Sequence, residues 1–119
     1  PNGKPDLVLI ASGSEVGLIV AAAETLRAQG LQARLVSMPS WELFDAQPQD
    51  YRDSVLPPTL TARLAVEAGS TQGWRRYAGD RGDVLGIDRF GASAPGDVLL
   101  REYGFTVDNV CKRAAALVR

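Results

Sequence analysis

The 119-residue chain contains no histidine, and it has only one cysteine and one methionine. Without histidine, it lacks the side chain that most often acts as a general base or binds a metal near neutral pH. The single cysteine, Cys111, excludes an internal disulfide and fits a reducing compartment. Because Cys111 stands at an apolar position of a helical pattern, we expect a buried, unreactive thiol.

Other absences narrow the class of protein. The chain has no run of 18 apolar residues and no signal peptide, so we expect a cytoplasmic protein without a membrane partner. Its 13 basic and 14 acidic residues give a net charge of −1, which offers no electrostatic basis for binding nucleic acid. The first residue is Pro1 and the one methionine is Met38, so we expect a piece of a longer protein. Residues 1–5, with two prolines and one glycine, are typical of a linker remnant, and residues 6–119 of one domain.

Alternation of strand and helix patterns sets the fold class. Residues 7–11 are all apolar, as in a strand buried on both faces, and a helical pattern follows up to a stop at Gly30. A second strand at 33–38 completes a βαβ unit, whose crossover should be right-handed. The apolar side of the first helix is predicted to hold Val16, Ile19, Val20, Ala23 and Leu26.

The remaining pattern extends the same alternation. Further strands are expected at 60–67 and 84–88, and further helices at 40–45, 49–56, 73–78, 93–104 and from Thr106 onward. The predicted fold is α/β: a three-layer α/β/α sandwich with a mostly parallel, about five-stranded sheet. In such sheets ligands bind at the carboxyl ends of the strands, so that edge is where a site is expected.

The turn after the first strand is one candidate site. Ser12, Gly13 and Ser14 precede a helix, whose free backbone N–H groups could bind a phosphate or carboxylate. The alternative interpretation is a turn without a ligand, in which Ser12 and Glu15 form a capping box. Neither the glycine-rich dinucleotide fingerprint nor a P-loop is present, and we favour the alternative.

Carboxylates at the same edge are a second candidate. Glu67 and Asp88 would follow two strands and could form an acid–base pair if burial raised the pKa of one of them. Without histidine or an aligned nucleophile, we favour structural roles: Glu67 bonded to backbone or a basic neighbour, and Asp88 capping a turn. Gly79-Asp80 with Asn109 partly resembles a motif for thiamine diphosphate and a divalent ion, but Arg81 replaces its second glycine, and we regard the match as chance.

Aromatic side chains leave two interpretations open. Trp41, Phe44, Trp74 and Tyr77 could line a groove or partner interface, or they could fill the core under short helices. The adjacent pair at positions 75–76, both arginine, is typical of a solvated face.

Six blocks of the chain resemble, in the same order, the C-terminal domain of the transketolase family. These blocks are Leu9 to Val16, Arg34 to Ser40 with Phe44-Asp45, Tyr51 to Pro57, Arg63 to Gly69, Phe90 to Pro95, and Tyr103 to Val110. The resemblance covers about residues 6 to 118, which is nearly the whole chain.

The resemblance implies a function for a longer parent enzyme. Transketolases move a two-carbon ketol unit from a ketose phosphate to an aldose phosphate, in the pentose phosphate pathway or the Calvin cycle. They use thiamine diphosphate and Mg²⁺ or Ca²⁺, and they are normally homodimers. The cofactor and catalytic residues of the family belong to the two preceding domains. The resemblance therefore implies that this chain alone is inactive, binds no cofactor, and packs against those domains and the second subunit.

Two other readings remain open from the sequence. One is the C-terminal domain of another thiamine diphosphate enzyme, either a 2-oxoacid dehydrogenase β-chain or deoxyxylulose phosphate synthase. The blocks beginning at Phe90 and Tyr103 are more similar to transketolase than to either. The other reading is a free-standing α/β module that binds a small anion.

Overall fold

The computed structural model describes residues 5–12, 15–38, 41–67, 74–79, 81–86 and 106–118. Within these ranges, the side chains at positions 41, 75 and 76 lie outside the described part of the structure. The predicted helix at 93–104 lies outside the described residues, as do Gly13, Ser14, Asp80 and Asp88.

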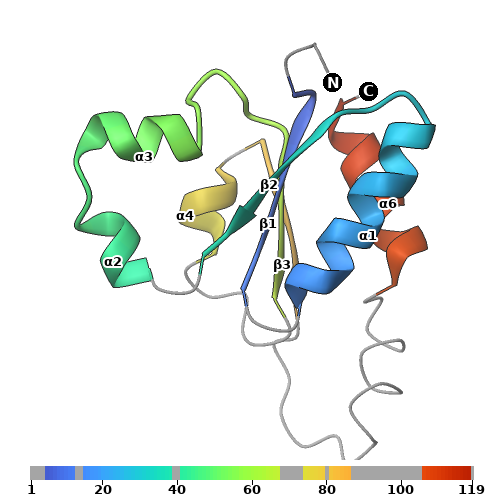
Figure 1. Cartoon of the computed structure of the whole chain (residues 1–119), viewed down its shortest axis with the longest axis horizontal. Helices are drawn as coiled ribbons and strands as arrows, with labels where there is room; N and C mark the ends of the chain where they lie inside the picture. Colours follow the sequence, from blue (N-terminus) through green and yellow to red (C-terminus); the bar gives the residue numbers. More distant parts are fainter. Residues whose placement is uncertain are drawn as a thin grey trace, which may run out of the picture.

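Four parallel strands form the sheet at the centre of the molecule (Figure 1). They are β1 (Leu7–Ala11), β2 (Ala33–Ser37), β3 (Arg63–Glu67) and β4 (Asp83–Gly86), in the spatial order β2-β1-β3-β4. In the register of the sheet, Leu9 of β1 pairs with Leu35 of β2 and Leu64 of β3. The described strands thus confirm a parallel α/β sheet, with four of the about five expected strands.

Helices cover both faces of this sheet. They are α1 (Glu15–Ala28), α2 (Trp41–Asp45), α3 (Gln49–Val55), α4 (Arg75–Ala78) and α6 (Val107–Val118). Figure 1 shows α1 and α6 together on one face, and α4 with α2 and α3 on the other, so the three-layer prediction is confirmed. We call residues 41–56, which include α2 and α3, the arm. None of the described helices is long and apolar enough to cross a membrane.

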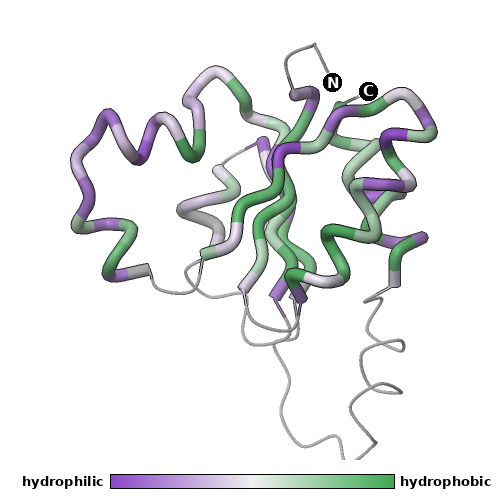
Figure 2. Tube along the Cα trace, viewed as in Figure 1, coloured by the Kyte–Doolittle hydropathy of each residue, from purple (hydrophilic) through white to green (hydrophobic). Residues whose placement is uncertain are grey.

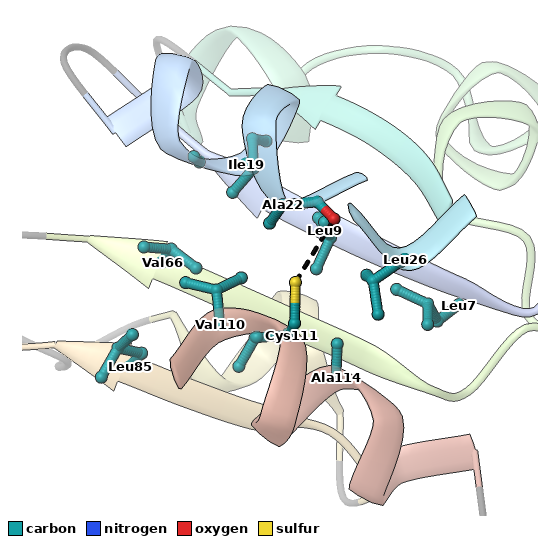
Figure 3. Packing of buried hydrophobic residues seen from close by; sticks show 12 residues of the cluster. Leu7, Leu9, Ile19, Ala22, Leu26, Val66, Leu85, Val110, Cys111 and Ala114 are labelled. Carbon is teal, nitrogen blue, oxygen red and sulfur yellow. Dashed lines mark hydrogen bonds between the residues drawn. The ribbon is translucent and has the colours of Figure 1, made fainter. Parts of the chain in front are cut away.

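The alternating side chains of β1 build two cores, one on each face. Leu7 and Leu9 pack toward α1 and α6, whereas Val8 and Ile10 pack toward α4. All of β1 is fully buried, as expected for a central parallel strand. Figure 2 shows the apolar strands in green between more polar helices, and Figure 3 shows the α1–α6 core from close by.

One predicted core position of α1 is wrong. The buried apolar residues of the helix are Ile19, Ala22 and Leu26, whereas Val20 is 43% exposed. Spacings of three and four residues keep 19, 22 and 26 on the side that faces the sheet and α6. Val20 is turned about 100° away from Ile19 and lies beside the β2 edge, where the described residues leave it partly uncovered.

Gly30 ends α1 as predicted. Its φ of 87° lies in the left-handed region, which glycine adopts without a steric penalty. The N–H of Leu31 donates to the carbonyl of Leu26 at 2.9 Å and closes the last turn. The chain can therefore turn at once toward β2.

Arg63, at the start of β3, ties several segments together. Its guanidinium donates to four backbone carbonyls: Leu60 at 2.9 Å, Tyr77 at 2.9 Å, Leu56 at 3.2 Å and Pro57 at 2.8 Å. Burial lowers the pKa of Arg63 from its usual value, because the charged form is desolvated. These bonds join the end of the arm and the end of α4 to the sheet.

Two further side chains tether the arm. Arg34 of β2 donates to the carbonyl of Val55 at 3.0 Å and of Ser54 at 2.6 Å. The Tyr77 hydroxyl of α4 donates to the two carboxylate oxygens of Asp45, at 3.1 and 3.2 Å. Since α3 has no buried residue, these polar bonds carry much of its attachment.

Candidate functional site

The carboxyl ends of β1 and β3 bring together two of the predicted site residues. Ser12 directly follows β1, and Glu67 is the last residue of β3. The Ser12 hydroxyl donates to Oε2 of Glu67 at 2.6 Å, across the 55 residues that separate them in the chain. A hydroxyl bonded to an ionised carboxylate is a short, charge-assisted contact. Glu67 therefore has a structural partner in the Ser12 hydroxyl, whereas the sequence analysis favoured backbone or a basic neighbour.

Glu15 adds a second carboxylate beside this turn. It is the first residue of α1 and is only 5% exposed, and its N–H donates to the carbonyl of Ser12 at 3.3 Å. An acidic side chain in the first turn interacts favourably with the helix dipole. Between Ser12 and Glu15 the chain lies outside the described residues, so the predicted capping box stays a prediction. The Ser12 hydroxyl donates across the sheet to β3.

These contacts bear on the predicted anion site. Of the three predicted residues, the structure describes Ser12, while Gly13 and Ser14 lie outside the described residues. The Ser12 hydroxyl is directed to the carboxylate of Glu67, and Glu15 follows Ser12 by three positions in the chain. Two carboxylates close to the turn oppose a phosphate electrostatically. The anion site stays a prediction, with the charges of the described residues against it.

The other predicted acidic constellations are not brought together among the described residues. Asp88 lies outside them, so the proposed pair with Glu67 stays untested. Gly79 follows α4 on one face of the sheet, and Asn109 lies in α6 on the other. The N–H of Asn109 donates to the side-chain oxygen of Thr106 at 3.1 Å, which caps the start of α6. The partial cofactor motif is thus divided between the two faces.

The described part of the chain contains no obvious site for a divalent ion. Within it, no group of three histidine, cysteine, aspartate or glutamate side chains comes together.

Two of the predicted aromatic residues fill the core. Trp74 and Tyr77 are 3% and 4% exposed, beneath and within α4. Tyr77 makes edge-to-face contacts with Phe44 and Trp74, at ring-centre distances of 5.8 and 6.1 Å. The core interpretation is confirmed for Trp74 and Tyr77, whereas the side chains at positions 41, 75 and 76 are outside the described part.

Cys111 is buried between α6 and α1, as predicted. Figure 3 shows its thiol pointing at the carbonyl of Ala22, to which it donates at 3.4 Å. Burial, and then the negative charge of Asp108, raise the pKa of the Cys111 thiol above its usual value. This environment keeps the thiol protonated and unreactive.

Comparison with known proteins decides the family. A family model described as the transketolase-like C-terminal domain matches residues 1–106. The chain belongs to the transketolase C-terminal domain family. It is 59% identical to a transketolase of Geobacillus stearothermophilus over 117 residues, and 50% identical to a chloroplastic transketolase of Zea mays over 113 residues.

Solved transketolases share the fold of this domain. The transketolase of Leishmania mexicana superposes with a TM-score of 0.88 at 44% identity, covering 97% of this chain and 16% of that one. A transketolase variant from Pichia stipitis gives a TM-score of 0.89 at 39% identity, covering 99% and 17%. The match with the G. stearothermophilus relative covers 98% of this chain but only 18% of that relative. These relatives are all transketolases, which favours the transketolase interpretation over the two other thiamine diphosphate enzymes considered above.

Proposed function

We propose that this chain is the non-catalytic C-terminal domain of a transketolase, which transfers a two-carbon ketol unit from a ketose phosphate to an aldose phosphate. The observation that carries the proposal is 59% identity to a transketolase across nearly the whole chain. One solved P. stipitis transketolase structure is described as a complex with xylulose 5-phosphate, which supports a sugar phosphate as the substrate class.

The parent enzyme in this proposal uses thiamine diphosphate with Mg²⁺ or Ca²⁺, bound outside this domain. Two features support that placement: the chain has no histidine, and the described carboxylates are not grouped as a metal site. The domain packs on the two preceding domains and on the second subunit of a homodimer. We place the enzyme in the cytoplasm, in the pentose phosphate pathway or the Calvin cycle.

Two measurements test this proposal. The full-length protein, with thiamine diphosphate and Mg²⁺, should transfer a ketol unit from xylulose 5-phosphate to an aldose phosphate acceptor, and omission of the cofactor should abolish transfer. The 119-residue chain should give no heat of binding when titrated with thiamine diphosphate and Mg²⁺. A lack of transfer by the full-length protein refutes the enzymatic part, and micromolar binding by the isolated chain refutes the division of labour.

The second candidate is a small-anion site at Ser12, Gly13 and Ser14, which would make the domain regulatory. Its supporting feature is the start of α1 at the carboxyl edge of the sheet. A crystal of the chain soaked in phosphate or a sugar phosphate tests it. Ordered anion density at this turn supports a regulatory domain, and an empty turn supports the architectural role that we favour.

A further inference from the structure

The amino ends of β3 and β4 border a pocket of about 320 Å³, which we call the amino-edge pocket. Its lining residues are Pro58, Thr61, Arg63, Ala78, Gly79 and Arg81. Arg63 is the first residue of β3, and Arg81 precedes β4, the strand beside it in the sheet. In Figure 1 this edge of the sheet lies near the N label, at the opposite end of the strands from the start of α1.

Close backbone contact holds Arg81 beside Arg63. The pairing of β3 with β4 begins one residue after Arg63, so the chain just before β4 runs along the start of β3. A Cβ atom at Gly82 would collide with the carbonyl oxygens of Arg63 and Ala78, and only glycine permits this approach. The position before that glycine, Arg81, is thereby brought to the same pocket as Arg63.

The described lining of the pocket is positively charged. It contains two arginines and no acidic residue, whereas the neighbouring pocket that Arg63 also lines contains Asp45 and Asp53. Arg63 bonds four backbone carbonyls and Arg81 is exposed, so neither guanidinium is paired with a carboxylate of the described residues. Burial lowers the pKa of Arg63 because its charge is desolvated, and an anion in the pocket would stabilise that charge.

The pocket also offers hydrogen-bond donors. A guanidinium carries five N–H groups, and the four carbonyl bonds of Arg63 leave one N–H of its Nη1. The Arg81 guanidinium and the Thr61 hydroxyl make no hydrogen bond to other residues in the described part of the chain. Planar arginine groups bind two oxygens of a phosphate at once, and a phosphate accepts further bonds from hydroxyls.

We propose that the amino-edge pocket binds a phosphate group, carried by inorganic phosphate or by a small phosphomonoester. Arg81 pairs with two phosphate oxygens, Arg63 supplies a second positive charge, and the Thr61 hydroxyl donates a further bond. The pocket volume is about ten times the share of one water molecule in the liquid, which leaves room for a phosphate and a few carbon atoms. The site goes beyond the proposed function, since it is built by residues of this chain and holds whether or not the parent enzyme transfers ketol units.

An NMR chemical-shift titration of the isotopically labelled 119-residue chain measures this binding. It is done at low ionic strength, where screening of exposed charges is weak. Inorganic phosphate and glycerol 3-phosphate are the two probes, and chloride at matched ionic strength is the blank. Arg81→Gln removes the exposed guanidinium from the pocket. The matched control is Arg27→Gln, which removes an exposed arginine from the last turn of α1, on the other face of the sheet.

We expect phosphate to shift the amide signals of Gly79 and Gly82 saturably, in the low millimolar range. Arg81→Gln should weaken this binding about tenfold, because charge-assisted hydrogen bonds are lost, and Arg27→Gln by less than about twofold. Tighter binding of glycerol 3-phosphate than of inorganic phosphate supports the site and assigns it to phosphomonoesters, whereas the reverse order supports it and assigns it to free phosphate.

Three results overturn the proposal. One is the absence of a saturable shift at Gly79 and Gly82, or an equal shift with chloride. Another is equal weakening by Arg81→Gln and Arg27→Gln, which reports net charge and not a site. The third is binding that survives Arg81→Gln unchanged, which assigns the anion to another surface such as the turn at Ser12. If Arg81→Gln does not fold, Arg81→Lys replaces it and should weaken binding about threefold, since lysine keeps the charge but lacks the planar fork.

Discussion

Loss of the Arg63 guanidinium should loosen the junction between β3, the end of α4 and the segment from Leu56 to Leu60. Arg63→Met keeps most of the packing of the side chain but removes every donor to the four carbonyls. A hydrogen bond to a charged group contributes about 1.5 kcal/mol at the low end, so four such bonds contribute about 6 kcal/mol. Relief of the desolvated charge offsets part of this loss, and we expect unfolding to become easier by about 3 to 4 kcal/mol.

Urea denaturation of the 119-residue chain, followed by circular dichroism, measures the change. With a slope of about 2 kcal/mol per molar urea, the midpoint should fall by about 1.5 to 2 M. Arg34→Met is the matched control, because Arg34 bonds two backbone carbonyls in place of four and one of its bonds is exposed, so about 1 kcal/mol should be lost.

Arg63→Lys separates geometry from charge. A lysine keeps the charge, but its single ammonium has three donors and lacks the planar fork. It should therefore destabilise nearly as much as methionine. Full stability of Arg63→Lys, or a loss below about 1 kcal/mol for Arg63→Met, would refute the claim that the four carbonyl bonds of Arg63 stabilise the domain.

Three further perturbations test the core and the thiol. Leu9→Ala removes a fully buried side chain from the central strand and should lower stability by about 3 kcal/mol in the same urea assay, and a loss below about 1 kcal/mol would contradict its burial. Tyr77→Phe removes the hydroxyl that bonds Asp45 and should lower stability by about 1 kcal/mol, with no change if Asp45→Ala is already present. The raised pKa of Cys111 means that folding disfavours its thiolate, so its contribution to stability is complete below the pKa of the unfolded thiol, about 8.5, and is lost as pH rises through the folded pKa. Cys111→Ser should weaken this alkaline loss, and an unchanged pH profile would argue against it.

Strands and layers were predictable because buried apolar residues recur at regular spacings in the sequence. The five apolar residues at 7–11 identify a central strand, and Gly30 identifies the end of α1. The partners of Arg63 left no such pattern: it is the first residue of β3, where four backbone carbonyls accept bonds from its guanidinium.

Contacts between distant segments were harder to predict. The bond from Ser12 to Glu67 depends on β1 and β3 being neighbours, and a single sequence does not give the strand order. Spacing alone also placed Val20 in the core, since periodicity reports an apolar side of a helix but not what covers it.

The contact between α1 and α6 has a consequence for biosynthesis. Cys111 and Ala22 meet across 89 positions of the sequence, so the core on that face closes only when α6 is available. During translation β1 and α1 leave the ribosome well before α6, and until residues 107–118 emerge, Leu9, Ile19 and Leu26 lack the cover of that helix. A product that stops before residue 107 would keep this core open, and we expect it to be directed to proteolysis.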